Sequence, residues 1–136
     1  MKKLFISCPM KGRTVEDILV TREAMHKIAE EFFGEELEVI PNFIPAPKDL
    51  PEGTNQSIWC LGRSIQMMAE ADYFIYVAGV NSVYHGCDVE LTAAAAYDIP
   101  CTYINHNGFA ACKDVTEAIN KYWDDLERGH RARVAD

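Results

Sequence analysis

The chain has 136 residues, of which 49% are hydrophobic and 25% are charged, values typical of one globular domain with a real core. Acidic residues outnumber basic ones by 21 to 13, and the net charge of −8 argues against a nucleic-acid duplex as a partner. No stretch approaches the ~20 apolar residues of a membrane-spanning helix, and the apolar run near the N-terminus is too short for a signal peptide.

The cysteines also indicate a compartment. Their number is odd, and no CxxC pair occurs among Cys8, Cys60, Cys87, Cys101 and Cys112. This pattern favours reduced thiols, so we expect a cytoplasmic protein that makes no contact with a membrane. The four histidines do not have the spacing of metal ligands, and we expect neither a metal nor another cofactor.

Apolar runs alternate with helical stripes along the chain. The expected strands are residues 3–7, 37–40, 73–78 and 101–104. The expected helices are residues 15–33, about 55–71, 87–97 and a last one around 115–126. Alternation of strand and helix predicts an α/β fold, a single domain over residues 1–128 with a Rossmann-like, mostly parallel sheet of four to five strands flanked by helices. Residues 129–136 are expected to form a loose polar tail.

A ligand site in such a fold lies beyond the carboxyl ends of the strands. Four loops are expected to converge there, formed by residues 7–13, 42–55, 79–90 and 105–108. The second of them contains three prolines and a glycine, and loops of this length are usually functional or mobile. Asn42 and Asp49 are its polar candidates.

The first loop, SCPMKGR, follows a strand and precedes a helix. It matches neither common phosphate-binding glycine motif, but helix N-terminal amides beside Lys11 and Arg13 would suit an anion. The alternative is a plain strand-to-helix turn with two solvated cations.

The segment GCDVELTAAAAYDIP places Glu90 in the first turn of its expected helix, where the many alanines allow close approach to the sheet. An ionised glutamate at such a position could attack an electrophilic carbon, although acids are also common in first turns for dipole reasons alone. His85, just before it, is either an acid, base or phosphate donor or a solvated loop residue.

Two segments together resemble the nucleoside 2-deoxyribosyltransferase-like superfamily over about residues 3–105. They are LFISCPMKGR and ADYFIYV…HGCDVELTAAAAYDIPCTYI, and residues 86–90 fit the G-x-x-x-E of the second family block. The superfamily includes deoxynucleoside-monophosphate N-glycosidases and small phage-associated relatives.

The resemblance implies a retaining mechanism on a nucleoside or nucleotide, in which Glu90 attacks C1′ and water or a second base resolves the glycosyl-enzyme. It also implies a homodimer, and it implies a 5′-phosphate site. The substrate-binding residues carried over or inferred at this edge are Ser7, Lys11, Gly12, Arg13, Asn42, Tyr84 and Gly86.

Four positions depart from the family pattern, one of them Leu91, where relatives carry a glycine. Ser64 stands where relatives carry an aspartate that handles the leaving base, Tyr84 replaces a further aspartate of the transferases, and Asp98 replaces the glycine of a G-x-P. Hydrolysis is therefore favoured over transfer, with His85 or Asp49 as the substitute acid. The alternative is a non-catalytic protein that binds or senses a nucleotide-like molecule.

Overall fold

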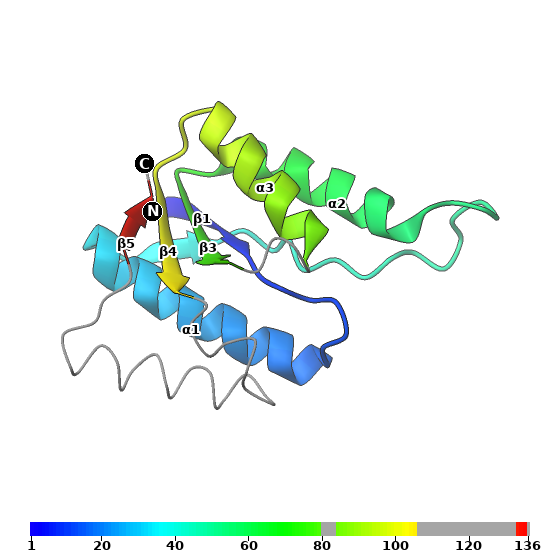
Figure 1. Ribbon diagram of the computed structural model, residues 1–136, viewed down its shortest axis with the longest axis horizontal. Helices are drawn as coiled ribbons and strands as arrows, with labels where there is room; N and C mark the ends of the chain where they lie inside the picture. Colours follow the sequence, from blue (N-terminus) through cyan, green and yellow to red (C-terminus); the bar gives the residue numbers. More distant parts are fainter. Residues whose placement is uncertain (80–83, 106–132, 136) are drawn as a thin grey trace.

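The computed structural model describes residues 1–79, 84–105 and 133–135, which form one layered α/β unit (Figure 1). Its centre is a sheet with the strand order β2-β1-β3-β4-β5. The strands are β1 (Lys2–Ser7), β2 (Leu37–Val39), β3 (Tyr73–Ala78), β4 (Cys101–Asn105) and β5 (Arg133–Ala135). The first four run parallel, and β5 pairs antiparallel with β4 at the edge.

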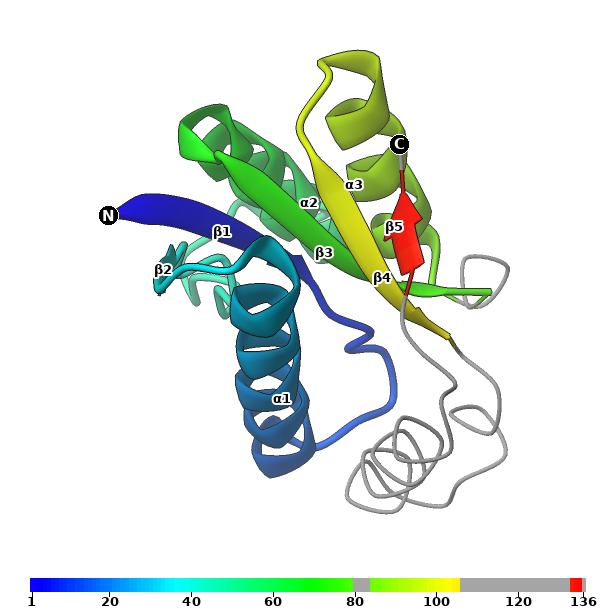
Figure 2. The ribbon, with the colours of Figure 1, turned by 90° about the vertical axis from the view of Figure 1, so that its left-hand side faces the viewer.

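Helices cover both faces of the sheet. The helix α1 (Val15–Phe33) lies on one face, and α2 (Gln56–Met67) and α3 (His85–Ala96) lie side by side on the other (Figure 2). A short 3-10 turn, η1 (Met68–Glu70), continues α2 toward β3. Parallel strands need such crossover connections, so the helix on each face follows from the order of the elements.

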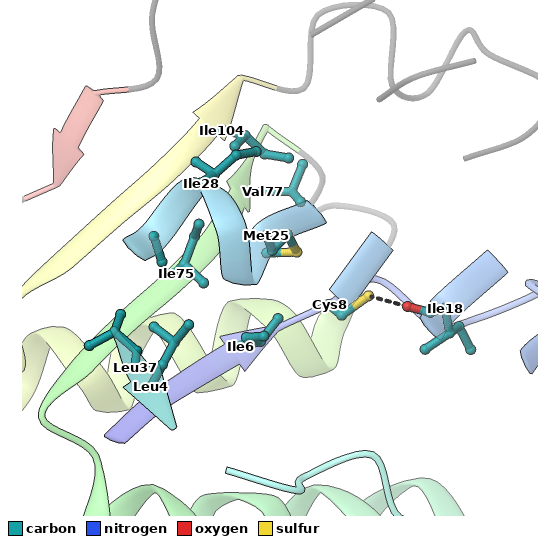
Figure 3. Close-up of a cluster of buried hydrophobic side chains, with 11 residues drawn as sticks. Leu4, Ile6, Cys8, Ile18, Met25, Ile28, Leu37, Ile75, Val77 and Ile104 are labelled. Carbon is teal, nitrogen blue, oxygen red and sulfur yellow. Dashed lines mark hydrogen bonds between the residues drawn. The ribbon is translucent and has the colours of Figure 1, made fainter. Parts of the chain in front are cut away.

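The core has two halves because successive side chains of a strand point to opposite faces. Leu4 and Ile6 of β1 pack under α1, beside Met25 of that helix (Figure 3). Phe5 points the other way and stacks on Phe74 of β3, with ring centroids 5.5 Å apart. A strand covered on both faces reads as a continuous apolar run, which is why residues 3–7 were recognisable.

The ends of α1 use the residues expected of them. The Thr14 hydroxyl accepts a hydrogen bond from the Asp17 amide at 3.2 Å, and Gly34 ends the helix in a left-handed conformation at φ 74°. A second left-handed residue is Asp98, at φ 58°, in the turn between α3 and β4. Aspartate tolerates this region better than most residues, and a glycine would adopt it freely.

The predicted fold class is confirmed: in the described residues, four parallel strands and three helices form a single Rossmann-like domain. The structure differs at residues 133–135, which were expected in a loose polar tail and instead form β5. A short edge strand is held by backbone hydrogen bonds and needs no apolar pattern, so composition gave no sign of it. The helix expected around residues 115–126 lies outside the described residues. No helix in the described part of the chain has the length and apolarity needed to cross a membrane.

Candidate functional site

Glu90 lies on α3 beneath the carboxyl ends of β1 and β3. The sequence predicted it in the first turn of its helix, but α3 begins at His85, so Glu90 is in the second turn. This prediction was wrong because the helix starts earlier than expected: the carbonyl of the N-cap residue Tyr84 accepts hydrogen bonds from the amides of Cys87 and Asp88. The helix dipole acts mainly on the first turn, so it contributes less to Glu90 than expected.

Two serine hydroxyls hold the Glu90 carboxylate. Ser7 donates to Oε1 at 2.8 Å from the end of β1, and Ser64 donates to Oε2 at 2.7 Å from α2. All three residues are buried, and Glu90 is only 7% exposed. Burial raises the pKa of Glu90 above its ordinary value, while the bonds from Ser64 and Ser7 and the charge of Arg22 act to lower that pKa.

Behind Ser64 lies a second polar layer. The Asn42 amide nitrogen donates to the Ser64 hydroxyl at 3.2 Å and to the Ile6 carbonyl at 3.1 Å. Its amide oxygen accepts from the Arg22 guanidinium at 2.8 Å. Arg22 also donates to the carbonyls of Ile6 and Ile40, at the ends of β1 and β2. A buried polar cluster of this kind persists only where its members satisfy one another.

The first loop is braced from inside by Arg13. Its guanidinium donates to the Pro9 carbonyl at 2.6 Å, to the Asp17 carbonyl at 3.2 Å and to the Thr21 hydroxyl at 2.5 Å. The turn closes with the Arg13 amide on the Met10 carbonyl, with the neighbouring glycine left-handed at φ 75°. The half-buried Arg13 therefore links the loop to α1 while part of it stays accessible.

Other predicted residues lie around this edge without joining the network. Lys11 and Gly12 are exposed in the first loop, and Asp49 is exposed in the second. Half-buried Tyr84 packs against the core beneath α1.

The entry of α3 separates two further predicted residues from the carboxylate. Gly86 faces Leu61 of α2, since a Cβ atom added to Gly86 would lie 3.9 Å from Cδ1 of Leu61. His85 is exposed, and at five helix positions from Glu90 it lies roughly 140° around the helix axis. The structure therefore does not place the imidazole beside the Glu90 carboxylate.

Two thiols border the site. Cys8 follows β1, and burial raises its pKa to about 11; Cys87 lies on α3, and burial raises its pKa to about 12. Both are therefore neutral thiols at physiological pH and poor nucleophiles. Among residues 1–79, 84–105 and 133–135, no group of three or more His, Cys, Asp or Glu side chains is arranged to hold a metal ion.

Of the predicted site residues, the structure brings Ser7, Asn42 and Glu90 into one network. It adds Ser64, which the sequence marked only as a missing acid, and Arg22, which was not among the predicted site residues. The network joins β1, the segment after β2 and all three helices at one point.

A signal for Arg22 was present in the sequence. It lies four residues after Ile18 and three before Met25, both buried on the inner face of α1. A charged residue in a buried stripe needs a partner, because an unpaired buried charge is costly. The helical period thus placed Arg22 inside, although it gave no indication of which groups it meets.

The arrangement supplies a buried carboxylate, oriented by two hydroxyls, at the edge where ligands bind in open α/β sheets. No protein-family model matches the chain, and neither a curated protein nor a solved structure does.

Proposed function

We propose that the protein hydrolyses the N-glycosidic bond of a nucleoside or nucleoside 5′-monophosphate, with Glu90 as the nucleophile. The observation that carries the proposal is the Glu90 carboxylate, buried and held on both oxygens by the hydroxyls of Ser7 and Ser64. A nucleophile must be held in a productive geometry, and two donors from separate elements do this.

The reaction has two steps. A Glu90 oxygen bonds to C1′ of the sugar as the C1′–N bond breaks. The electron pair of the C1′–N bond leaves with the base nitrogen, which takes up a proton. Water then adds to C1′ and releases the glutamate, and its second proton returns to solvent. The hydroxyl bonds to the carboxylate lower its pKa, which counters the effect of burial and favours the reactive anion.

The first loop is the proposed phosphate site. The first-turn amides of α1 that Thr14 does not cap, next to Gly12 and Arg13, are the proposed donors to an oxyanion. Lys11 adds a charge, and Tyr84 and Gly86 border the same edge from the entry of α3. The left-handed Asp98 also fits the resemblance, since relatives carry a glycine at the matching position.

The proton for the leaving base needs another source than Ser64. Its hydroxyl proton is directed at Glu90 Oε2, and its oxygen accepts from Asn42. Asp49 and His85 are both exposed and are the candidate donors on the loops, and water is the third. Hydrolysis, with water as the acceptor, remains favoured over transfer to a second base.

Release of free base tests the proposal directly. Ribo- and deoxyribonucleosides and their 5′-monophosphates are incubated with the protein, and the products are separated by chromatography. At least one substrate should release base, and Glu90→Gln should reduce that rate by roughly a thousandfold because no anion remains to attack.

The matched control is Asp88→Asn, an exposed acid on the same helix, which should retain the wild-type rate. Absence of base from every substrate, or a Glu90→Gln variant as fast as wild type, contradicts the proposal.

A second candidate is a binding protein for the same class of ligand. It is favoured by the occupation of both Glu90 oxygens by protein hydroxyls, an arrangement that also serves a purely structural carboxylate. This candidate predicts a thermal shift with nucleotides and no product, so the same substrate panel distinguishes the two.

A further inference from the structure

A chain of hydrogen bonds leads from a buried cation to the proposed nucleophile. It runs from Arg22 through Asn42 and Ser64 to Glu90, over distances of 2.8, 3.2 and 2.7 Å. We propose that Arg22 is a positioning residue for Glu90, which orients the carboxylate by fixing the direction of every donor in this chain. Its catalytic consequence rests on the proposed function, but its effect on the carboxylate does not.

The direction of the chain follows from the chemistry of its two fixed ends. A guanidinium can only donate, so the Asn42 atom facing Arg22 must be the amide oxygen. The Ile6 carbonyl can only accept, so the atom facing it must be the amide nitrogen, and both contacts give the same orientation.

The serine then has no choice of direction. Because the Asn42 nitrogen donates to Ser64, the single proton of Ser64 goes to Glu90 Oε2. Without Arg22 the Asn42 oxygen loses its donor, and of these two contacts only the Ile6 carbonyl still holds the amide in this orientation. If the amide turned over, Ser64 would donate to Asn42, and Glu90 would lose one of its two hydroxyl donors.

Charge supports the same assignment. The charged or titratable groups near Glu90 are Arg22 from α1, Cys8 from the end of β1 and Cys87 from α3, while α2 contributes the uncharged Ser64. The two thiols are neutral, so within the described residues Arg22 is the cation that opposes the burial of this carboxylate. Arg22 itself is only 7% exposed, as is Glu90. Dissolved salt therefore screens the attraction between these two buried charges only weakly.

The test measures the carboxylate directly, by a carbon-13 NMR titration of the glutamate side chains. The Glu90 signal is assigned from its loss in Glu90→Gln. Ser64→Ala removes the donor itself and sets the size of the effect. Arg22→Gln and Asn42→Leu should each raise the pKa of Glu90 by about one unit, a roughly tenfold smaller ionised fraction at a pH below that pKa.

Asn42→Leu isolates the relay because it leaves every charge in place. Lys27→Gln, on the exposed side of α1, controls for the loss of one positive charge and should leave the titration unchanged. If Arg22→Gln does not fold, Asn42→Leu and Arg22→Lys decide the question. A Glu90 titration in Asn42→Leu equal to that of wild type overturns the proposal.

Turnover gives a second readout. The acidic limb of kcat/KM should move to higher pH in Asn42→Leu, and Arg22→Lys should restore part of the rate lost in Arg22→Gln. A wild-type protein that releases no base defeats the proposed function alone, because the titration still decides whether Arg22 orients Glu90.

Discussion

At the scale of single residues, Glu90 combines a buried charge with a reactive position. Removing a carboxylate from water is costly, and two hydroxyl bonds offset only part of that cost. The pKa of Glu90 is accordingly raised by burial even with Ser64, Ser7 and Arg22 opposing the shift. The ionised form of Glu90 therefore lowers the stability of the fold.

The free energy of unfolding should therefore depend on Glu90 in a pH-dependent way. Its pKa in the folded state is above the ordinary 4.5, so between these two values the unfolded chain holds fewer protons. Wild-type stability then falls as the pH rises through this window, and the full penalty is present above the folded-state pKa. Glu90→Gln carries no such penalty and should be more stable than wild type at neutral pH.

Urea unfolding of wild type and Glu90→Gln across this range measures the difference. The advantage of the variant should shrink as the pH falls toward the ordinary glutamate value. Asp88→Asn, which removes an exposed negative charge from the same helix, is the control. A stability difference that does not change with pH contradicts a buried ionised Glu90.

Single residues also show how far the sequence could reach. Glu90 was predicted from its place in a G-x-x-x-E segment and in the first turn of an alanine-rich helix, and Ser7 from its place at a strand end. The link through Ser64 was out of reach, because α2 is far from α3 in sequence and only the packing of the two helices makes the contact. The partners of Arg22 were equally out of reach, because only the folded structure shows which backbone carbonyls face it.

At the scale of elements, the first loop shows a side chain with two tasks. Arg13 binds the loop to α1 through Pro9 and Thr21, and it is also the proposed phosphate cation. Arg13→Ala should lower the free energy of unfolding by about 1–2 kcal/mol through these hydrogen bonds. It should also weaken nucleoside monophosphates far more than the matching nucleosides, because only the former carry the anion.

Calorimetric titration with one nucleoside and its 5′-monophosphate separates the two tasks. Thr21→Val removes one Arg13 contact but leaves the cation, so it serves as the control for loosening of the loop. If Arg13→Ala weakens both ligands equally, Arg13 braces the loop and does not contact the phosphate.

Element boundaries were predictable where local chemistry sets them. The start and end of α1 followed from Thr14 and Gly34, which act through their own backbone and neighbours. The start of α3 did not, because Tyr84 makes no side-chain cap and the helix gains its first turn by backbone bonds alone. The edge strand β5 was equally hidden, since its partner β4 is distant in sequence.

At the scale of the whole molecule, the sheet order explains why the site lies where it does. In the order β2-β1-β3-β4 the chain leaves β1 toward α1 on one face and leaves β3 toward α3 on the other. The carboxyl end of β1 and the helix that follows β3 therefore meet at one edge, as the hydrogen bond from Ser7 to Glu90 shows. The apolar runs were sufficient to predict the parallel part of this sheet, because the central strands β1 and β3 contribute to the core on both faces.

The helix α2 is only partly covered by the rest of the described chain. Among the residues of α2, all within the described part of the chain, Ser64 alone is buried. Ile58 is 65% exposed, and Trp59 and Leu61 are only half-buried, whereas Ile65 packs against the core. A helix that turns its polar serine inward and leaves apolar side chains outside is suited to packing against another surface.

We propose that this surface is covered by a second copy of the chain, as the family resemblance implies. Sedimentation at micromolar concentration should give the mass of a dimer, and Ile58→Lys should shift it toward the monomer because the lysine charge would be desolvated in the contact. Leu19→Lys, at a residue 52% exposed on α1 across the sheet, should leave the mass unchanged.

A wild-type monomer, or an Ile58→Lys dimer as stable as wild type, would leave α2 without this role. A shift in both variants would instead indicate general loss of stability, which urea unfolding of each variant measures separately.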